Sequence, residues 1–387
     1  LLRPPTAQYV TTLQPSVLCR LASAALAFAV LAPLGMAQGR IDVLNNSGEV
    51  TPLANTTVIA ETLDEVRYTR SGSERTETRP TARVIFIDYG KGSDAFDGAQ
   101  EALASGDLLN AVNLFSAAVN DKSPGWVSAH ALLGLAEAQA AAQKTDQARD
   151  AIQRFLDSWP DHRLTPRALL LSARYASAAG DAARAQSDID QVLALVNSDR
   201  VTPDWAVRAH LERGQNLLDA GNFADSGTAF AAATAAAKEG AKRLDERQDL
   251  ADELANLGLR ARSGSGSALL AAGDIAAARS FFDTLKQDGK NDPAIRVAAL
   301  NGLAEADFRD EGRLKEAQLG FSKVAVLGTG VPDEHAKALY YMGMCCEALG
   351  EDGLEPNGRA RAHQYYKDVE RRYPGTRWAR LAREQLP

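Results

Sequence analysis

Hydrophobic and polar positions change their periodicity once along the chain, near residue 90. Between residues 40 and 90, β-branched residues alternate with polar ones in short runs that are separated by turn signals such as NNSG and RSGS. This alternation is typical of half-buried β-strands. It predicts strands at 41–44, 56–62, 65–70, 75–79 and 83–89. Strands this short and closely spaced favour a small barrel or a curled sheet, so we expect an all-β domain over 38–91.

After residue 93 the spacing of hydrophobic residues becomes helical and repeats. Turn residues recur at intervals of 37, 37, 41, 52, 39 and 38 residues, at Gly106, Gln143, Gly180, Gly221, Gly273, Gly312 and Gly350. Nine positions after each of the first six turns stands a large hydrophobic residue: Phe115, Ile152, Ile189, Phe230, Phe282 and Phe321. The residue five positions after these turns is always small, and the residue seven positions before is small except at Glu305. Small residues let two helices approach while the large residue fills the space between them, which predicts a series of helix–turn–helix units.

This register resembles the tetratricopeptide repeat, which carries small residues and a large hydrophobic residue at the same relative positions. Pro160 and Pro374 stand where that repeat has its proline. The resemblance implies a mainly α fold, a right-handed α-solenoid of about seven helix pairs over 93–387, preceded by the small β domain. In size and strand number the β domain resembles the Sm-like and SH3-like barrels. A cap that closes the first helix pair is the alternative interpretation of this domain.

The first 37 residues differ from the rest of the chain. They contain Arg3 and Arg20 but no acidic residue, and residues 21–37 form an apolar run that ends in small residues. This layout is typical of a secretory signal peptide, so we expect cleavage after Ala37 and export to the periplasm or cell envelope. A retained membrane anchor, or a translation start nearer residue 17, are the alternatives. We expect no membrane span in the mature chain.

Net charge and cysteine content narrow the classes of function. The chain has a net charge of −7, and without the two arginines of the predicted signal it keeps 41 basic and 50 acidic residues, or 41 − 50 = −9. A general nucleic-acid binder needs a basic surface, so this charge balance argues against binding of nucleic acid. Cys345 and Cys346 are adjacent and would bridge each other only with strain. We expect them to pack in a core, with a redox pair as the alternative.

The sequence contains no recognisable catalytic or metal-binding motif. The five histidines are scattered without a convincing second ligand at helical spacing. The segment RSGSGSALL (262–270) lacks the ending of a phosphate-binding loop, and no strand is predicted before it. We therefore predict that the protein is not an enzyme and that it holds no metal ion and no cofactor.

The tetratricopeptide resemblance implies that the first helices of the repeats line a groove for a partner polypeptide. Two repeat positions supply the candidate partner-binding residues: His130, Glu137, Arg167, Arg174, Arg208, Gln215, Arg260 and Lys337. A row of cations at one position of the repeat would favour an acidic partner, because guanidinium groups bind carboxylates through charge-assisted hydrogen bonds. The alternative is that these are solvated arginines near helix starts.

Two functions therefore compete. The first is a non-enzymatic scaffold in the bacterial cell envelope or periplasm that binds a protein or peptide, without nucleic acid. The last unit, from AKALYYMGMCCEALG onward, is similar to the repeats of periplasmic proteins associated with the Tol-Pal system, which favours the envelope. The second is a structural subunit that forms homo-oligomers through its β domain. Segment 359–384, with eight basic and three acidic residues, is a rival site for any anionic partner.

Overall fold

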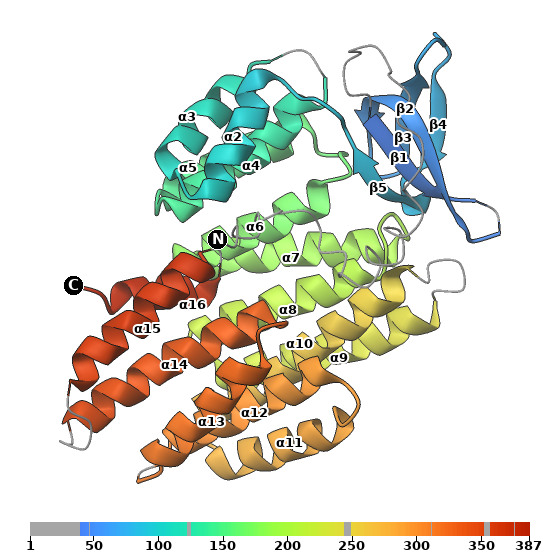
Figure 1. The fold of residues 1–387 in the computed structure, drawn as a ribbon. Coiled ribbons are helices and arrows are strands. Elements are labelled where there is room, and N and C mark those ends of the chain that lie inside the picture. Colours follow the sequence, from blue (N-terminus) through green and yellow to red (C-terminus); the bar gives the residue numbers. More distant parts are fainter. Residues whose placement is uncertain are drawn as a thin grey trace, which may run out of the picture. The chain divides into compact units, whose positions relative to one another are not determined.

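The computed structural model describes residues 39–45, 47–121, 125–243, 249–310, 312–351, 357–374 and 376–387 (Figure 1). The predicted signal peptide lies outside these ranges. The chain divides into two compact units: unit 1 comprises the described residues up to Ala209 together with Gly240–Leu254, and unit 2 comprises His210–Glu239 and Ala255–Pro387. The prediction of a mainly α, helical-repeat chain with a small N-terminal β domain is confirmed.

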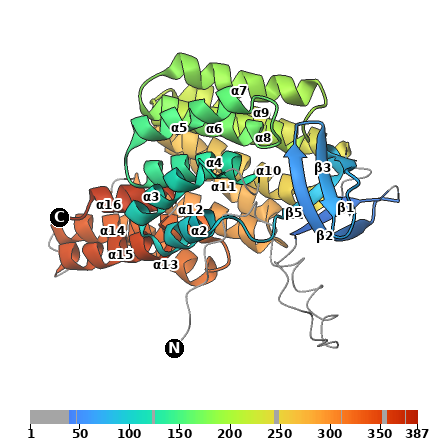
Figure 2. The ribbon, with the colours of Figure 1, turned by 90° about the horizontal axis from the view of Figure 1, so that it is seen from above.

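Unit 1 begins with an antiparallel sheet of five strands in the order β4-β3-β2-β1-β5. The strands are β1 (Gly39–Leu44), β2 (Val50–Glu61), β3 (Glu65–Arg70), β4 (Glu77–Pro80) and β5 (Val84–Asp88), with the 3₁₀ turn η1 (Thr81–Arg83) before β5. The core of the sheet contains the fully buried Ile41, Val66 and Tyr68. In Figure 2 the five strands are drawn in blue.

The other described elements of unit 1, and those of unit 2, are helices. In unit 1 they are α2 (Asp94–Ser105), α3 (Leu108–Ala118), α4 (Val127–Ala141), α5 (Thr145–Ser158), α6 (Thr165–Ala178) and α7 (Ala182–Asn197). The boundaries between the units fall within α8 (Asp204–Asp219), α9 (Phe223–Lys242) and α10 (Asp249–Ala271). In unit 2 they continue as α11 (Ile275–Asp288), α12 (Pro293–Phe308), α13 (Leu314–Leu327), α14 (Pro332–Glu351), α15 (Gly358–Arg372) and α16 (Arg377–Glu384). None of the helices in the described ranges is long and apolar enough to cross a membrane.

The predicted turns are present in six of seven places. Each of the first six turn residues has a positive φ, between 61° at Gln143 and 83° at Gly312, which is the left-handed conformation that ends a helix. Gly350 is the exception, because it lies inside α14. Close packing of α14 and α15 near this residue depends on Gly358 of α15, where a Cβ would come within 2.8 Å of the Gly350 Cα atom.

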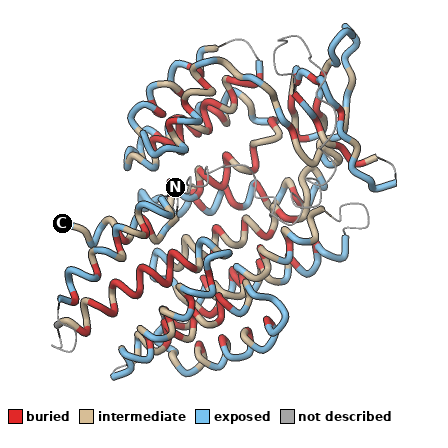
Figure 3. The backbone as a smooth tube through the Cα atoms, viewed as in Figure 1, coloured by how far each residue is buried: buried red, intermediate tan, exposed pale blue. Residues whose placement is uncertain are grey.

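Within each unit, large side chains of one helix pack against small residues of a neighbouring helix. All six of the predicted large residues are buried, with at most 3% of their surface exposed. A Cβ on Gly214 would lie 2.8 Å from the ring of Phe230, and one on Gly266 would lie 2.3 Å from the ring of Phe282. Buried positions therefore follow the helix faces that meet neighbouring helices of the same unit, drawn red in Figure 3.

Candidate functional site

The eight predicted partner-binding residues are divided between the two units. His130, Glu137, Arg167, Arg174 and Arg208 belong to unit 1, whereas Gln215, Arg260 and Lys337 belong to unit 2. Among the eight, the structure places Glu137 and Arg167 in direct contact. Each unit must therefore be considered by itself.

In unit 1, two arginines of the first helices are paired with acidic residues of neighbouring first helices. Arg167 of α6 forms an ion pair with Glu137 of α4. Arg208 of α8 donates to Glu253 of α10 at 2.6 Å, and to Asp204 of its own helix at 3.1 Å. We call Glu137, Arg167, Arg208 and Glu253 the first-helix ladder. Because each cation has an acidic neighbour, the ladder is close to neutral, which the sequence alone did not predict.

The remaining predicted residues have different surroundings. Arg174 of α6 and Arg260 of α10 are exposed. Gln215 of α8 donates to Asp219 one turn further along its own helix, at 2.9 Å. The exposed positions of Arg174 and Arg260 are therefore accessible to a partner.

We expected Lys337 of α14 to be accessible to a partner. In the structure it is buried, with 5% of its surface exposed. Its Nζ lies 2.8 Å from Oε2 of Glu305 on α12, whose Oε1 also accepts from Arg309 and from the hydroxyl of Tyr341. Burial alone would raise the pKa of Glu305, but the charges of Lys337 and Arg309 outweigh it and lower the pKa to about 2. Glu305 is the residue that broke the small-residue pattern, and its ion pairs explain how a carboxylate is tolerated there.

A second charged cluster fastens the β domain to the helices of unit 1. We call Glu61, Tyr89, His130, His162 and Arg163 the joint cluster. Oε2 of Glu61, at the end of β2, accepts from the Tyr89 hydroxyl at 2.7 Å and from Nε of Arg163 at 2.8 Å. Oε1 faces Nε2 of His130 at 3.3 Å. Burial alone would raise the pKa of Glu61, but Arg163 and then His130 outweigh it, so this pKa lies well below its usual value.

The joint cluster contains three groups with the chemistry of metal ligands. Donor atoms of Glu61, His130 and His162 lie within 4.8 Å of one another. However, Nδ1 of His162 accepts the backbone N–H of Leu164 at 3.1 Å, so in the neutral ring Nε2 carries the proton. A metal bound at Nε2 would require the other tautomer and the loss of this bond, beside the permanent charge of Arg163. The arrangement therefore fits a closed ion-pair cluster better than a metal centre.

The backbone and a further arginine reinforce the joint. Leu63, in the turn between β2 and β3, donates its N–H to the carbonyl of Asp161 at 2.8 Å, in the loop between α5 and α6. Arg200 bridges the carboxylates of Asp64 and Asp161 at 2.8 and 2.6 Å. The β domain is thus held by α4, by the α5–α6 loop and by Arg200.

Local spacing could not have predicted the joint cluster. Glu61 is separated by 69 residues from His130 and by 102 residues from Arg163. One signal was present, since Glu61 is the only charged residue in the predicted strand 56–62. A shift of register between Val58 and Ala60 then turns Glu61 to the buried side of the sheet.

The two cysteines are not placed for chemistry. Cys345 and Cys346 are fully buried free thiols in α14. Burial raises the pKa of Cys345 to about 12 and also raises that of Cys346. Because the thiolate is the reactive form, these side chains behave as core residues.

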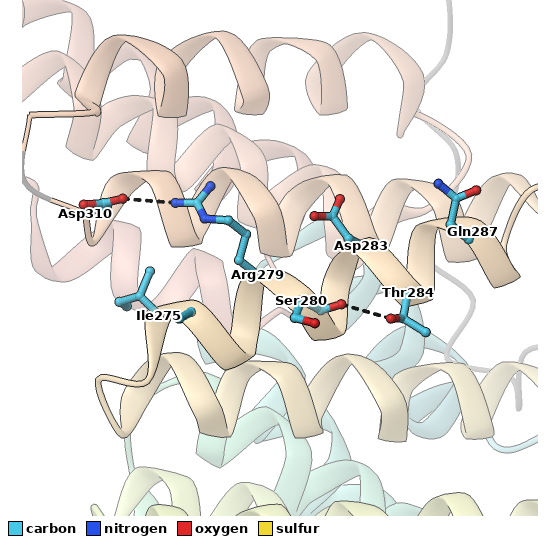
Figure 4. A pocket seen from close by; sticks show the side chains of 8 residues that line it. Ile275, Arg279, Ser280, Asp283, Thr284, Gln287 and Asp310 are labelled. Carbon is cyan, nitrogen blue, oxygen red and sulfur yellow. Dashed lines mark hydrogen bonds and ion pairs between the residues drawn. The ribbon is translucent and has the colours of Figure 1, made fainter.

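An open hollow of about 800 Å³ lies along α11 in unit 2 (Figure 4). Its charged residues are Arg279, Asp283 and Asp310, and Arg279 donates to Asp310 at 3.2 Å and also to Asp307. The lining combines these ion pairs with small polar side chains such as Ser280 and Thr284. Nothing in this lining pairs a nucleophile with a base.

Similar solved structures are helical-repeat proteins. A tetratricopeptide repeat protein from Parabacteroides merdae shares 17% identity over 76% of this chain and 96% of its own, with a TM-score of 0.45. PilW, a type IV pilus biogenesis factor, shares 20% identity over 65% of this chain and 97% of its own (TM-score 0.36). PilF of Pseudomonas aeruginosa shares 16% identity over 66% of this chain and 97% of its own, with a TM-score of 0.35. No protein-family model and no curated protein matches the sequence. These likenesses concern the repeat fold and do not extend to a function.

Proposed function

We propose that the protein is a non-catalytic scaffold of the bacterial cell envelope or periplasm, and that the first-helix ladder of unit 1 binds a partner polypeptide. The observation that carries the proposal is the partial exposure of the ladder. The side chains of Arg167 and Arg208 are 35% and 27% exposed, and those of Glu137 and Glu253 are 20% and 21% exposed. These charged groups are ordered by their pairs, yet they remain within reach of another chain.

The chemistry of the ladder indicates what kind of partner it would hold. A guanidinium group has five N–H donors in a fixed plane, and the pairs described above use only some of them. The remaining donors suit carbonyl oxygens of an extended backbone and carboxylates of acidic side chains. Because Glu137 and Glu253 already balance the arginines, an acidic partner has to compete with them, so we expect moderate affinity and strong dependence on salt.

Export to the envelope rests on the predicted signal peptide and remains part of the proposal. The exported chain should begin near Gln38, which an intact-mass measurement on protein from an envelope fraction would reveal. A mass that includes residues 1–37 would contradict the cleavage.

The test of the scaffold is capture of a partner from an envelope extract by the full chain, compared with a variant carrying Arg167→Ala and Arg208→Ala. Arg154→Ala is the matched control, because Arg154 is an exposed arginine on the second helix α5. Loss of a specific partner with the ladder variant, and its retention with the control, would support the proposal. Equal capture by all three proteins would contradict it.

The alternative function, a self-assembling envelope subunit that pairs through its β domain, has one structural observation in its favour. Strands β4 and β5 are the two edges of the sheet, and each is hydrogen-bonded to a neighbouring strand on one side. Edge strands can pair with a second chain. Association of this kind uses backbone hydrogen bonds, and it should therefore persist at high salt.

A further inference from the structure

The first and last helix pairs carry opposite charge. Segment 91–121, which contains α2 and α3, has one lysine and five acidic residues, a balance of 1 − 5 = −4. Segment 358–384, which contains α15 and α16, has eight basic and three acidic residues, a balance of 8 − 3 = +5. In a chain with a net charge of −7, the last pair is a local reversal of sign.

The basic residues of α15 and α16 exceed what their own acidic residues neutralise. Each of the three acidic side chains there is matched within the pair: Asp368 with Arg371, Glu370 with Arg383, and Glu384 with Arg380. Arg359 and Lys367 of α15 are exposed and add to this balance. Lys367 and Arg371 stand one turn apart, on one face of the helix.

The acidic residues of α2 also share a helix face. Asp94, Asp97 and Glu101 follow each other at spacings of three and four residues, and the side chain of Asp94 is 93% exposed. Lys91 pairs with Asp94 and is the only basic residue of segment 91–121. The same helix pair exposes 68% of Leu109 on α3, an apolar side chain that an interface would cover.

We propose that α15 and α16 of one copy of the chain dock onto α2 and α3 of a second copy. The two surfaces are complementary in charge, and neither belongs to the first-helix ladder, so the contact goes beyond the proposed partner site. It joins two different surfaces and is head-to-tail, so copies add to one another in a ring or an open row. Ion pairs between exposed side chains are individually weak and are screened by salt, so the association is reversible and salt-dependent.

The experiment is sedimentation of the full chain over a range of concentrations, at roughly 50 mM and roughly 500 mM salt. We expect the average mass to rise with concentration at low salt and to fall to that of the monomer at high salt. One variant reverses the acidic face (Asp94→Lys with Glu101→Lys), and a second reverses the basic face (Lys367→Glu with Arg371→Glu). Each variant alone should weaken self-association by about tenfold or more.

An equimolar mixture of the two variants should restore association, because each reversed face then meets the other reversed face. A variant that has lost its fold cannot be rescued by mixing, so this arm separates docking from misfolding. The control variant carries Asp146→Lys and Asp150→Lys, at exposed positions of α5. It changes the net charge by the same amount as the variant with the reversed acidic face, and it should leave association unchanged.

Three outcomes would overturn the proposal. The first is an average mass equal to that of the monomer at every concentration at low salt. This result would overturn the proposal even if the two faces paired within a single chain. The second is association that persists at high salt and in both variants, which would favour the edges of the sheet instead. The third is failure of the mixture to regain the association of the parent chain.

Discussion

The joint cluster and the first-helix ladder lie in the same unit and use the same kinds of side chain, yet solvent reaches them differently. In the joint, the carboxylate of Glu61 has 1% of its side chain exposed, and protein donors surround both of its oxygens. In the ladder, Glu137 keeps 20% exposure beside Arg167. When the cation beside a buried carboxylate is removed, no water can take the place of that cation. An exposed carboxylate that loses its cation is solvated by water instead. The joint is therefore closed to solvent, whereas the ladder remains within its reach, and our proposal that the ladder binds a partner rests on this difference.

The largest effect should follow from removing the cation of the joint. Arg163→Met leaves the buried carboxylate of Glu61 without its main partner, which should cost about 3–5 kcal/mol in the free energy of unfolding. Urea unfolding of the variant beside the parent would measure it. Arg154→Met on the exposed face of α5 is the control and should change stability by no more than about 0.5 kcal/mol.

A companion variant sharpens this result. Combining Arg163→Met with Glu61→Gln removes both charges and should recover part of the lost stability, because the unpaired buried charge is gone. If Arg163→Met alone were as stable as the parent, the joint would not be a buried ion pair, and the contrast with the ladder would fail.

Lys337 tests whether burial, rather than position in the repeat, decides how much a charged residue contributes to stability. Its repeat position groups it with Arg167 and Arg208, whereas its contacts resemble those of the joint. Lys337→Met should cost about 2–3 kcal/mol, less than Arg163→Met, because Arg309 and Tyr341 still donate to Glu305. Thermal or urea unfolding would show it. If Lys337→Met changed the free energy of unfolding as little as loss of an exposed arginine does, Lys337 would contribute to stability in the way expected of Arg167 and Arg208.

Repeat periodicity predicted most of the fold and little of the chemistry. The fixed distance from each turn to a residue such as Phe230 identified the helix pairs, because packing two helices imposes the same sizes in every copy. Gly350 was misassigned because a glycine in the sequence does not by itself end a helix, and here it lies inside α14. The joint cluster was missed because a strand with a shifted register brings Glu61 against residues of α4 and the α5–α6 loop. Such long-range contacts leave no local pattern in the sequence.

Acid should weaken the joint within a defined range of pH. Burial lowers the pKa of His162 from 6.5 to about 4, although Glu61 opposes the shift. A histidine with a lowered pKa in the folded state contributes stability that is complete above pH 6.5 and is lost as the pH falls toward 4. The contribution that is lost at pH 5 is about 2 kcal/mol. His130 and Arg163 face the same carboxylate, and the low pKa of Glu61 keeps it charged throughout this range.

The measurement is urea unfolding of the parent chain and of His162→Gln at pH 7 and at pH 5. The parent should lose more stability than the variant over this interval, by about 2 kcal/mol. Parallel losses in the two proteins would assign the acid sensitivity to other groups.

The smallest effect on stability should come from the ladder itself, together with the largest effect on binding. Replacing Arg167 and Arg208 by alanine removes partly exposed ion pairs, which contribute little to stability because water and salt screen them. We expect the free energy of unfolding to change by about 1 kcal/mol or less, and the affinity for a captured partner to fall by about tenfold or more. Unfolding in urea and titration of the labelled partner at two salt concentrations measure the two quantities. A loss of stability as large as that of Arg163→Met would place the ladder with the joint, as part of the packing of unit 1. Unchanged affinity in a fully stable variant would move the search for the binding surface to the basic residues of α15 and α16.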